Sequence, residues 1–463
     1  MSSATAVDVV VLGAGPAGQT AAIQAAQAGK HVVLVDEAVS VGGECVRRGT
    51  IPSKTLRETA IAVRAFESRT AGLFPLEPHA GRTLESLMSR MSAVVKAHDA
   101  FMGQRLAQND VTLWRGRARF VEPRVVRVQM LDGSARTVTA PTVVVATGSR
   151  PRIPDGIPVD HENVLDSDSF LSMAYLPRSL TVIGAGVIAS EYASIFASLG
   201  TAVTMIDKAP RPLGFLDPEL SLAFVRALEL AGGRYVGGAL PSGVEWNGVD
   251  AVVAHLPSGE VVSSEKALVA LGRVANVRAL APEAAGLTVD RRGLLSVDEH
   301  CRTGAPGVYA VGDVIGPPAL ASSAVEQGRR AMRHALGLPA APGHDLVPMA
   351  VYTIPEMSSV GLTAEDAAKV GPCVVGRARF DELTRGHIAA AQDGLLKLVV
   401  AEEGRRLVGV QIVGEGAAEL VHVGQMALLA KMPVDVFVDN VFNFPTLAEA
   451  YRVAALDAVR QLA

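Results

Sequence analysis

The feature that most constrains the fold of this chain is a glycine-rich pattern that occurs twice. In each copy a short apolar strand runs into a glycine-rich turn, a helix rich in small residues follows, and a second apolar strand ends in an aspartate. The motif positions are Gly13, Gly15, Gly18 and Asp36 in the first copy and Gly184, Gly186, Ala189 and Asp207 in the second. A single glycine fingerprint is weak evidence, but two matched copies predict two parallel α/β units.

Each position of the pattern has a physical role in holding a dinucleotide. The first glycine permits a tight turn, the second lets the backbone approach a pyrophosphate, and the third position needs a small residue so that helix and strand pack closely. The helix N-terminus offers unpaired N–H groups to the phosphates, and the acid accepts hydrogen bonds from a ribose diol. We therefore expect an α/β fold with two Rossmann-like dinucleotide-binding domains.

Length and composition indicate a protein of several domains. A chain of 463 residues is too long for one ordinary core, and 49% hydrophobic against 19% charged residues allows large buried cores. The formal charge of -4 gives no electrostatic reason to bind nucleic acid or an anionic membrane. The sequence has no long apolar run, no signal-peptide core and only three dispersed cysteines, so we expect a soluble cytoplasmic protein, and no metal site.

Four further segments contain residues with a chemical role beyond packing. In Gly42–Lys54, Gly42 and Gly43 precede Cys45, and Thr50 stands where a second cysteine would complete a redox pair. The other three segments are Ala146-Thr147-Gly148, Gly307–Asp313 and Val351–Glu356. Together with the two fingerprints, and in this order, these segments resemble the class I pyridine nucleotide–disulfide oxidoreductases. The resemblance covers essentially the whole chain.

That resemblance implies a domain plan. It implies an FAD-binding domain at 1–150, an NAD(P)-binding domain at 151–276, a return to the FAD domain at 277–345 and an α+β dimerisation domain at 346–463. Proline-rich stretches after Arg150 and around 337–347 are suitable boundaries. The resemblance also implies a homodimer, or a higher homo-oligomer, in which the C-terminal motif of one subunit completes the flavin site of its neighbour.

The resemblance also assigns roles to residues at matching positions. Lys54 and Glu191 match an ion pair beside the reactive end of the flavin, where a cation would stabilise the negative charge of the reduced ring. The expected FAD residues are Gly13, Gly15, Gly18, Asp36, Glu37, Gly42, Gly43, Cys45, Lys54, Ala146, Thr147, Gly148 and Asp313. The expected nicotinamide-nucleotide residues are Gly184, Gly186, Ala189, Glu191, Asp207, Lys208 and Gly272.

Two departures from the family pattern decide the expected chemistry. Thr50 removes the second thiol, and a hydroxyl has no disulfide state. Phe444 stands where the family has a histidine, and a phenyl ring cannot transfer a proton, although Glu449 is retained. Both losses abolish dithiol exchange, and Cys45 is then expected to line the flavin pocket without redox duty. The expected catalytic set is Lys54, Glu191, Cys45, Thr50, Phe444 and Glu449.

The chemistry that remains is hydride transfer between stacked rings, which needs geometry and electrostatics but no side-chain base. Within the family, Cys45 with Thr50 and the segment 445–456 resemble the energy-independent flavoprotein transhydrogenases of the Si-specific type. This implies ping-pong transfer of hydride between NADPH/NADP+ and NAD+/NADH through FAD. The alternatives are an NAD(P)H:quinone reductase of the same fold, and after it a dihydrolipoamide dehydrogenase-like enzyme or a flavin redox sensor without turnover.

The preference between the two nicotinamide nucleotides stays open at this point. Asp207 favours the free ribose of NAD and repels the 2′-phosphate of NADP, whereas Lys208 and Arg211 could pair with that phosphate. We expect activity with both nucleotides and tighter binding of NAD(H).

The remaining notable residues have ordinary explanations. Apolar residues at helical spacing over 84–102 predict a packed helix, and Cys301 and Cys373 are expected to be structural. His387, expected in a loop, and His422, on an apolar helix, are assigned no catalytic role.

Overall fold

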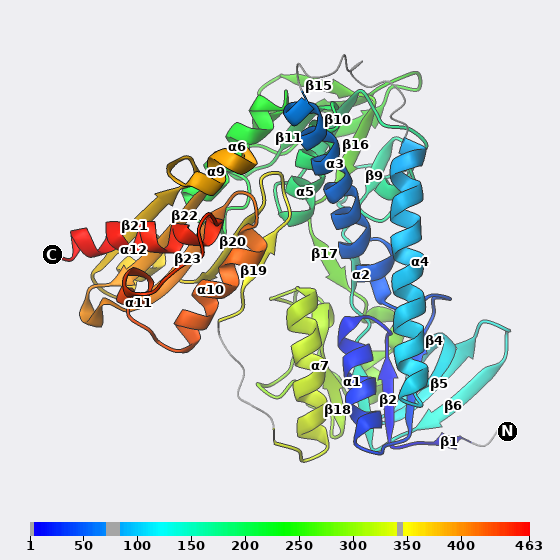
Figure 1. The fold of residues 1–463 in the computed structure, drawn as a ribbon. Coiled ribbons are helices and arrows are strands. Elements are labelled where there is room, and N and C mark those ends of the chain that lie inside the picture. Colours follow the sequence, from blue (N-terminus) through cyan, green and yellow to red (C-terminus); the bar gives the residue numbers. More distant parts are fainter. Residues whose placement is uncertain (1–3, 71–83, 340–345) are drawn as a thin grey trace. The chain divides into compact units, whose positions relative to one another are not determined.

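The structure, a computed structural model, describes residues 4–70, 84–339 and 346–463, and Figure 1 shows its helices and strands. The chain forms two compact units. Among the described residues, the first unit comprises 4–55, 84–152 and 272–339, and the second comprises 56–70, 153–271 and 346–463. Each unit contains one of the two glycine turns, so each turn is described within its own unit.

The first unit is built on an eight-stranded mixed sheet with the order β1-β6-β5-β4-β3-β2-β7-β18. Its strands are β1 (Thr5–Ala6), β2 (Val9–Leu12), β3 (Val32–Asp36), β4 (Thr112–Glu122), β5 (Val125–Met130), β6 (Ala135–Thr139), β7 (Thr142–Val145) and β18 (Val308–Ala310). The pairs β3–β2, β2–β7 and β7–β18 are parallel, and all four residues of β2 are buried. Both faces of β2 are covered, one by the helices over 16–27 and 321–335 and the other by β4–β6 and the turns over 278–285, so the strand needs a continuous apolar sequence.

Helices pack against one face of the central strands, and 3-10 turns contribute to the core on the other face. They are α1 (Pro16–Gln27), α2 (Gly43–Arg47), the first residues of α3 (Thr50–Thr70), α4 (Leu84–Gln108), α7 (Ala321–Ala335) and the 3-10 turns η2 (Arg278–Leu280), η3 (Pro282–Ala285) and η4 (Gly312–Ile315). Helices α1 and α7 lie side by side (Figure 1), because Gly328 has no Cβ to overlap the carbonyl group of Ala17. A separate antiparallel pair joins β8 (Ser149–Pro151) to β17 (Arg273–Ala275).

The N-terminal part of the second unit contains a five-stranded parallel sheet of the order β12-β11-β10-β16-β9. Its strands are β9 (Val164–Asp166), β10 (Ser179–Ile183), β11 (Ala202–Ile206), β12 (Arg234–Val236) and β16 (Lys266–Val269). The associated helices are η1 (Phe170–Ser172), α5 (Val187–Ser198) and α6 (Pro218–Leu230). A three-stranded antiparallel sheet adds β13 (Gly243–Trp246), β14 (Val252–His255) and β15 (Val261–Ser264).

The C-terminal part of the second unit is an antiparallel sheet with helices. The sheet order is β19-β20-β23-β22-β21, with β19 (Met349–Val351), β20 (Met357–Gly361), β21 (Cys373–Arg379), β22 (Leu395–Ala401) and β23 (Leu407–Val413). Its helices are α8 (Ala364–Val370), η5 (Phe380–Glu382), α9 (Thr384–Ala389), η6 (Glu403–Arg405), α10 (Ala417–Leu429), α11 (Asp435–Asp439), η7 (Leu447–Glu449) and α12 (Ala450–Gln461). Tyr451 is fully buried in this core, and its hydroxyl donates to the carbonyl oxygen of Leu420.

The predicted fold class is confirmed, because both glycine turns connect parallel strands to helices and the C-terminal part is α+β. Two local predictions differ from the structure. His387 lies in helix α9, not in a loop, and the predicted packing of α4 applies to Met102 but not to Phe101, which is 53% exposed. The side chains of Leu84 and Leu87 lie outside the described residues. Within the described ranges, no helix is long and apolar enough to cross a membrane.

Candidate active site

The first glycine turn joins β2 to α1 in a conformation that only glycine fits. Gly13 has φ of +106°, and an added Cβ would overlap the carbonyl oxygen of Ala146 at the end of β7. A Cβ at Gly18 would overlap the carbonyl oxygen of Gly13. Gly43 approaches Gly15 so closely that its Cβ would lie 2.8 Å from the Gly15 Cα. No side chain of the described residues caps α1, so its first turn offers N–H groups to a phosphate.

Asp36 ends β3 beside this turn and is held on both sides. Its Oδ2 accepts a hydrogen bond from the Ala14 N–H at 2.7 Å, and its Oδ1 accepts one from the Ala38 N–H at 2.8 Å. The Gly42 N–H in turn donates to the Ala14 carbonyl at 2.8 Å. Each carboxylate oxygen keeps a second lone pair, so the group can still accept from a ribose diol. Glu37 instead lies at the surface and pairs with Arg117 at 2.9 Å.

A contact that the sequence analysis missed supports the Gly42–Gly43 loop. The Val41 N–H donates to Oδ1 of Asp99 on α4 at 2.7 Å. An aspartate in the middle of a long helix is usually a solvated residue, so no local signal marks it as a partner for a loop so distant in sequence. Helix α4 therefore supports the loop that presses Gly43 against Gly15.

The predicted flavin end brings Cys45, Thr50, Lys54 and Asp313 together within the first unit. Burial raises the pKa of the Cys45 thiol, and the charge of Asp313 adds to this effect. A hydrogen bond from Thr50 and the charge of Lys54 lower that pKa in part. The thiol is therefore protonated at neutral pH, and its hydrogen-bond partner is a hydroxyl at the position of the family's second sulfur.

Asp313 is fixed by a chain of polar contacts from the β8–β17 pair. The Ser149 hydroxyl donates to Oδ2 of Asp313 at 2.6 Å. Arg273 donates from Nε to the same hydroxyl and from a terminal nitrogen to the Ser149 carbonyl, both at 2.8 Å. The sequence analysis did not include Ser149 or Arg273. Their signal was available, since both directly adjoin predicted site residues, Gly148 and Gly272.

The Ala146-Thr147-Gly148 segment is anchored by one asparagine. The Thr147 hydroxyl donates to the Asn276 carbonyl at 2.8 Å, and the Asn276 side-chain amide donates to the Thr147 carbonyl at 3.1 Å. The Asn276 N–H also donates to the Gly148 carbonyl at 2.9 Å. These bonds hold the segment that faces Gly13 and join it to Asn276, which follows β17.

The second glycine turn repeats the strand-to-helix geometry in the second unit. Gly184 has φ of +121°, and an added Cβ would lie 2.5 Å from the Ala270 carbonyl oxygen. Gly186 is open, because a Cβ there would meet none of the described atoms within 4 Å. Ala189 is buried, as its packing role requires. Asp207 follows β11, its Oδ1 accepts from the Ala209 N–H at 2.8 Å, and Lys208 is exposed. Gly272 belongs to the first unit, so the structure does not group it with this turn.

Glu191 projects from α5 toward the segment that leads from β19 to β20. Its Oε1 accepts from the Tyr352 N–H at 3.0 Å, and the Ser194 hydroxyl accepts from the Ile354 N–H at 3.1 Å. Buried Arg57 donates to the Thr353 carbonyl at 3.0 Å. The predicted segment Val351–Glu356 is thus fixed around Glu191. Lys54 lies in the other compact unit, so its pairing with Glu191 stays a prediction.

The C-terminal motif presents its aromatic ring to the surface of the chain. Phe444 is 66% exposed. Glu449 accepts from the Thr446 N–H at 3.3 Å, and Thr446 caps η7 in a capping box with it. In the single chain the retained glutamate therefore stabilises the turn after Phe444.

The two histidines given no catalytic role have local partners. His387 contacts the Asp381 carbonyl at 2.8 Å, and His422 contacts the Gln425 side chain at 2.9 Å. Both are exposed.

Comparisons with known proteins agree with this geometry. The family model for pyridine nucleotide-disulphide oxidoreductases matches residues 7–328, and the model for the dimerisation domain of those proteins matches residues 347–455. A soluble pyridine nucleotide transhydrogenase of Mycobacterium bovis is 41% identical over 463 residues, covering 98% of this chain and 97% of the relative. One of Aliivibrio fischeri is 40% identical, covering 99% and 98%. The crystal structure of LpdA from Mycobacterium tuberculosis superposes with a TM-score of 0.90 at 28% identity, covering 99% of this chain and 100% of the other.

Proposed function

Because this chain belongs to the pyridine nucleotide-disulphide oxidoreductase family, we propose that it is an FAD-dependent transhydrogenase that moves hydride between NADPH/NADP+ and NAD+/NADH. The observation that carries the proposal is the Cys45–Thr50 contact, in which a hydroxyl occupies the place of the sulfur relay. The full-length likeness to proteins named as transhydrogenases supports it. The ping-pong order follows if one nicotinamide site serves both dinucleotides in turn.

The residues of the first unit fit FAD. The open first turn of α1, the glycine contact between Gly15 and Gly43, and the acid Asp36 suit the pyrophosphate and adenosine ribose. When bound, FAD supplies a two-electron carrier of hydride. Lys54 would place a positive charge near the reactive ring end, and Asp313, oriented by Ser149, would bind the ribitol side.

The protein's own contribution to the reaction is electrostatics and geometry. Cys45 stays protonated because burial raises its pKa, so it adds no negative charge that would compete with Lys54. Glu191, held by the Tyr352 N–H, would pair with Lys54 and fix its position. No base is needed, because a hydride carries its own electron pair between the rings.

We also propose a homodimer with the domain plan given above. The match of the dimerisation-domain model to 347–455 and the exposed Phe444 support it, since an exposed ring can complete a neighbour's flavin site. The segments 1–150 and 277–345 would form the FAD domain, which the pairing of β18 with β7 supports. The Si stereochemistry and the cytoplasmic location stay predictions.

The test is an anaerobic titration of the purified flavoprotein with NADPH, followed by NAD+. The flavin absorbance should bleach with NADPH and return with NAD+, and NADPH should reduce thio-NAD+ in steady state. Failure of NADPH to reduce the flavin would overturn the proposal. Faster turnover with a panel of quinones than with thio-NAD+ would favour the quinone reductase.

The variant Thr50→Cys tests the role of the Cys45–Thr50 contact. The new thiol should form a disulfide with Cys45, so that a pair of titratable thiols disappears on oxidation and returns on reduction. The parent protein should show no such change. A parent that loses a thiol pair, or that turns over lipoamide, would contradict the assignment.

A further inference from the structure

The segment Lys208–Leu216, here called the strap, connects the ribose acid of the second glycine turn to helix α6. At one end the Ala209 N–H donates to Asp207, and the Tyr235 hydroxyl donates to the Ala209 carbonyl at 2.7 Å. Burial and the nearby charge of Asp207 raise the pKa of Tyr235 to about 12, so its hydroxyl remains a donor at neutral pH. The strap therefore begins at the position where the adenosine ribose of a nicotinamide nucleotide would bind.

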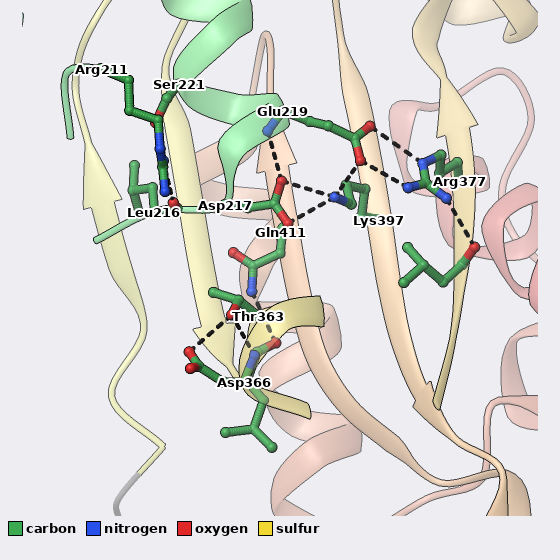
Figure 2. Close-up of polar contacts among 12 residues, drawn as sticks. Arg211, Leu216, Asp217, Glu219, Ser221, Thr363, Asp366, Arg377, Lys397 and Gln411 are labelled. Carbon is green, nitrogen blue, oxygen red and sulfur yellow. Dashed lines mark hydrogen bonds and ion pairs between the residues drawn. The ribbon is translucent and has the colours of Figure 1, made fainter. Parts of the chain in front are cut away.

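Arg211 is turned inward onto the strap itself. One terminal nitrogen donates to the Leu216 carbonyl at 2.9 Å and to the Ser221 hydroxyl at 3.1 Å, as Figure 2 shows. The other terminal nitrogen donates to the Gly214 carbonyl at 3.2 Å. A guanidinium with this many local acceptors is a brace for the backbone. These bonds use three of its five N–H groups, so we favour support of the backbone over the expected pairing with a 2′-phosphate.

The strap also contacts the glycine turn. The Leu213 N–H donates to the carbonyl of Ala185 at 2.9 Å, and Ala185 lies between Gly184 and Gly186. Leu213 adopts φ of +51° and is almost fully buried. A leucine in the left-handed region persists only where its surroundings fix it. Arg211 precedes Leu213 and its three acceptors follow it, so these bonds span Leu213 and bear directly on the position of Ala185.

The far end of the strap is tied to the C-terminal sheet. Asp217 caps α6 through the Glu219 N–H at 2.9 Å and accepts two hydrogen bonds from buried Lys397 of β22, at 2.7 and 2.8 Å (Figure 2). Lys397 also donates to Glu219 at 2.6 Å, and Arg377 donates to Glu219 at 2.8 Å. Hydrogen bonds from Arg377 and Lys397 lower the pKa of Glu219 to about 2, so the acid stays ionised. The strap is thus fixed at both ends.

We propose that Arg211 is a positioning residue for the nicotinamide nucleotide and takes no part in binding a 2′-phosphate. It holds the strap and the Ala185 carbonyl in place for NAD(H) and NADP(H) alike. The discrimination between them rests on Asp207, which repels the 2′-phosphate, and on exposed Lys208, which attracts it. The inference rests on the proposed function for the identity of the nucleotides. It deepens that function by assigning the positioning of both nucleotides to Arg211 and the discrimination between them to Asp207 and Lys208.

The experiment is calorimetric binding of NAD+ and of NADP+ to the oxidised full-length flavoprotein, in which no turnover occurs. Arg211→Met should weaken both nucleotides by the same factor, about tenfold, as expected from the loss of hydrogen bonds to a charged group. The matched variant Lys208→Met should weaken NADP+ alone. At saturating NADH, the rate of flavin reduction by Arg211→Met should stay near that of the parent, which separates positioning from chemistry.

Three results would overturn the proposal. They are a loss of NADP+ binding alone in Arg211→Met, unchanged binding of both nucleotides, or a flavin reduction rate that falls together with affinity. If Arg211→Met fails to fold, Ser221→Ala removes one acceptor of the same guanidinium and should weaken both nucleotides equally but less. The binding pattern does not depend on transhydrogenation, so failure of the proposed function would leave it measurable.

Discussion

The two glycine turns share one fingerprint but differ in what surrounds the second glycine and the acid. At the first turn a Cβ on Gly43 would lie 2.8 Å from the Gly15 Cα, although a Cβ on Gly15 itself would meet only the Gly43 Cα, at 4.0 Å, and both oxygens of Asp36 accept backbone N–H groups. At the second turn a Cβ on Gly186 would meet none of the described atoms within 4 Å, and one oxygen of Asp207 accepts the Ala209 N–H. A turn with a second loop packed against it and a doubly held acid suits a cofactor that stays, whereas a turn without such a loop suits a nucleotide that must leave in every cycle. The fingerprint identifies the ligand class, and its surroundings determine how long the ligand is kept.

The strongest test of this difference is a methyl group at the first glycine of each turn. Gly13→Ala adds a Cβ that overlaps the Ala146 carbonyl and strains a positive φ, so we expect loss of FAD and a cost on the order of 3 kcal/mol in unfolding free energy. Gly184→Ala, with its Cβ 2.5 Å from the Ala270 carbonyl, should keep FAD and lose nicotinamide-nucleotide binding. Flavin content and denaturant unfolding measure both.

The control for these variants is Gly133→Ala. Its φ is +85°, but a Cβ there meets none of the described atoms within 4 Å, so backbone strain alone should cost about 1 kcal/mol. Equal loss of FAD from Gly13→Ala and Gly184→Ala would break the comparison.

Removing the buried cation that holds Asp217 at the end of the strap should give an effect of similar size on stability, without loss of FAD. Lys397→Met leaves Asp217 buried without its partner, which we expect to cost about 3–5 kcal/mol of unfolding free energy. NAD+ affinity should fall while FAD stays bound, because the damage lies in the second unit. Adding Asp217→Asn, which keeps the helix cap but removes the stranded charge, should recover part of the loss. A Lys397→Met protein as stable as the parent would show that the strap has no need of this anchor.

A smaller effect separates the two acids. In Asp36→Asn an N–H₂ group replaces one of two accepting oxygens, so we expect a cost of about 1–3 kcal/mol and faster release of FAD on ultrafiltration. Asp207→Asn keeps the oxygen that Ala209 needs and removes the charge that repels a 2′-phosphate. Its affinity for NADP+ should rise severalfold relative to NAD+ by calorimetry, with FAD content unchanged. Equal flavin release from both variants would contradict the assignment of a resident and an exchanging ligand.

The smallest effect concerns the thiol at the first site. Since burial raises the Cys45 pKa above its usual 9.0, alkylation by iodoacetamide should be slow at pH 7 and should accelerate as pH rises through and above 9. Thr50→Val removes the hydrogen bond that lowers this pKa, so its rate profile should shift to higher pH. Peptide mapping by mass spectrometry separates Cys45 from Cys301 and Cys373. A profile with a midpoint below 9 would show that the site stabilises the thiolate.

Much of the fold and of the first site was predictable from the sequence, because both depend on local patterns. Short apolar runs before and after each glycine turn predicted the parallel strands, and the Gly42–Lys54 segment placed Thr50 where the second thiol of a redox pair would stand. The hydrophobic period of α4 was also read correctly as a helix, but periodicity does not tell which apolar residues find a partner. Phe101 therefore remained exposed against expectation.

The features that were missed depend on partners far apart in the chain. Lys397 interrupts an apolar strand, and a lysine in such a position indicates a buried ion pair. The neighbouring sequence does not indicate that Asp217 is its partner. Arg211 stands next to the ribose acid and was a reasonable candidate for a phosphate ligand. In the fold, two backbone carbonyl groups and the Ser221 hydroxyl accept three of its five N–H groups. Whether an arginine at this position supports the backbone or binds a phosphate depends on the three-dimensional arrangement, which the residue type alone does not indicate.

The threonine beside Cys45 affects how the protein responds to the redox state of its surroundings. A hydroxyl has a single oxidation state under biological conditions, so it cannot form a disulfide. Peroxides and cellular thiols therefore cannot switch this position between an oxidised and a reduced form. The two ratios NADPH/NADP+ and NADH/NAD+ would then together set the direction of flux. Such an enzyme would keep its hydride transfer independent of thiol–disulfide exchange at this position.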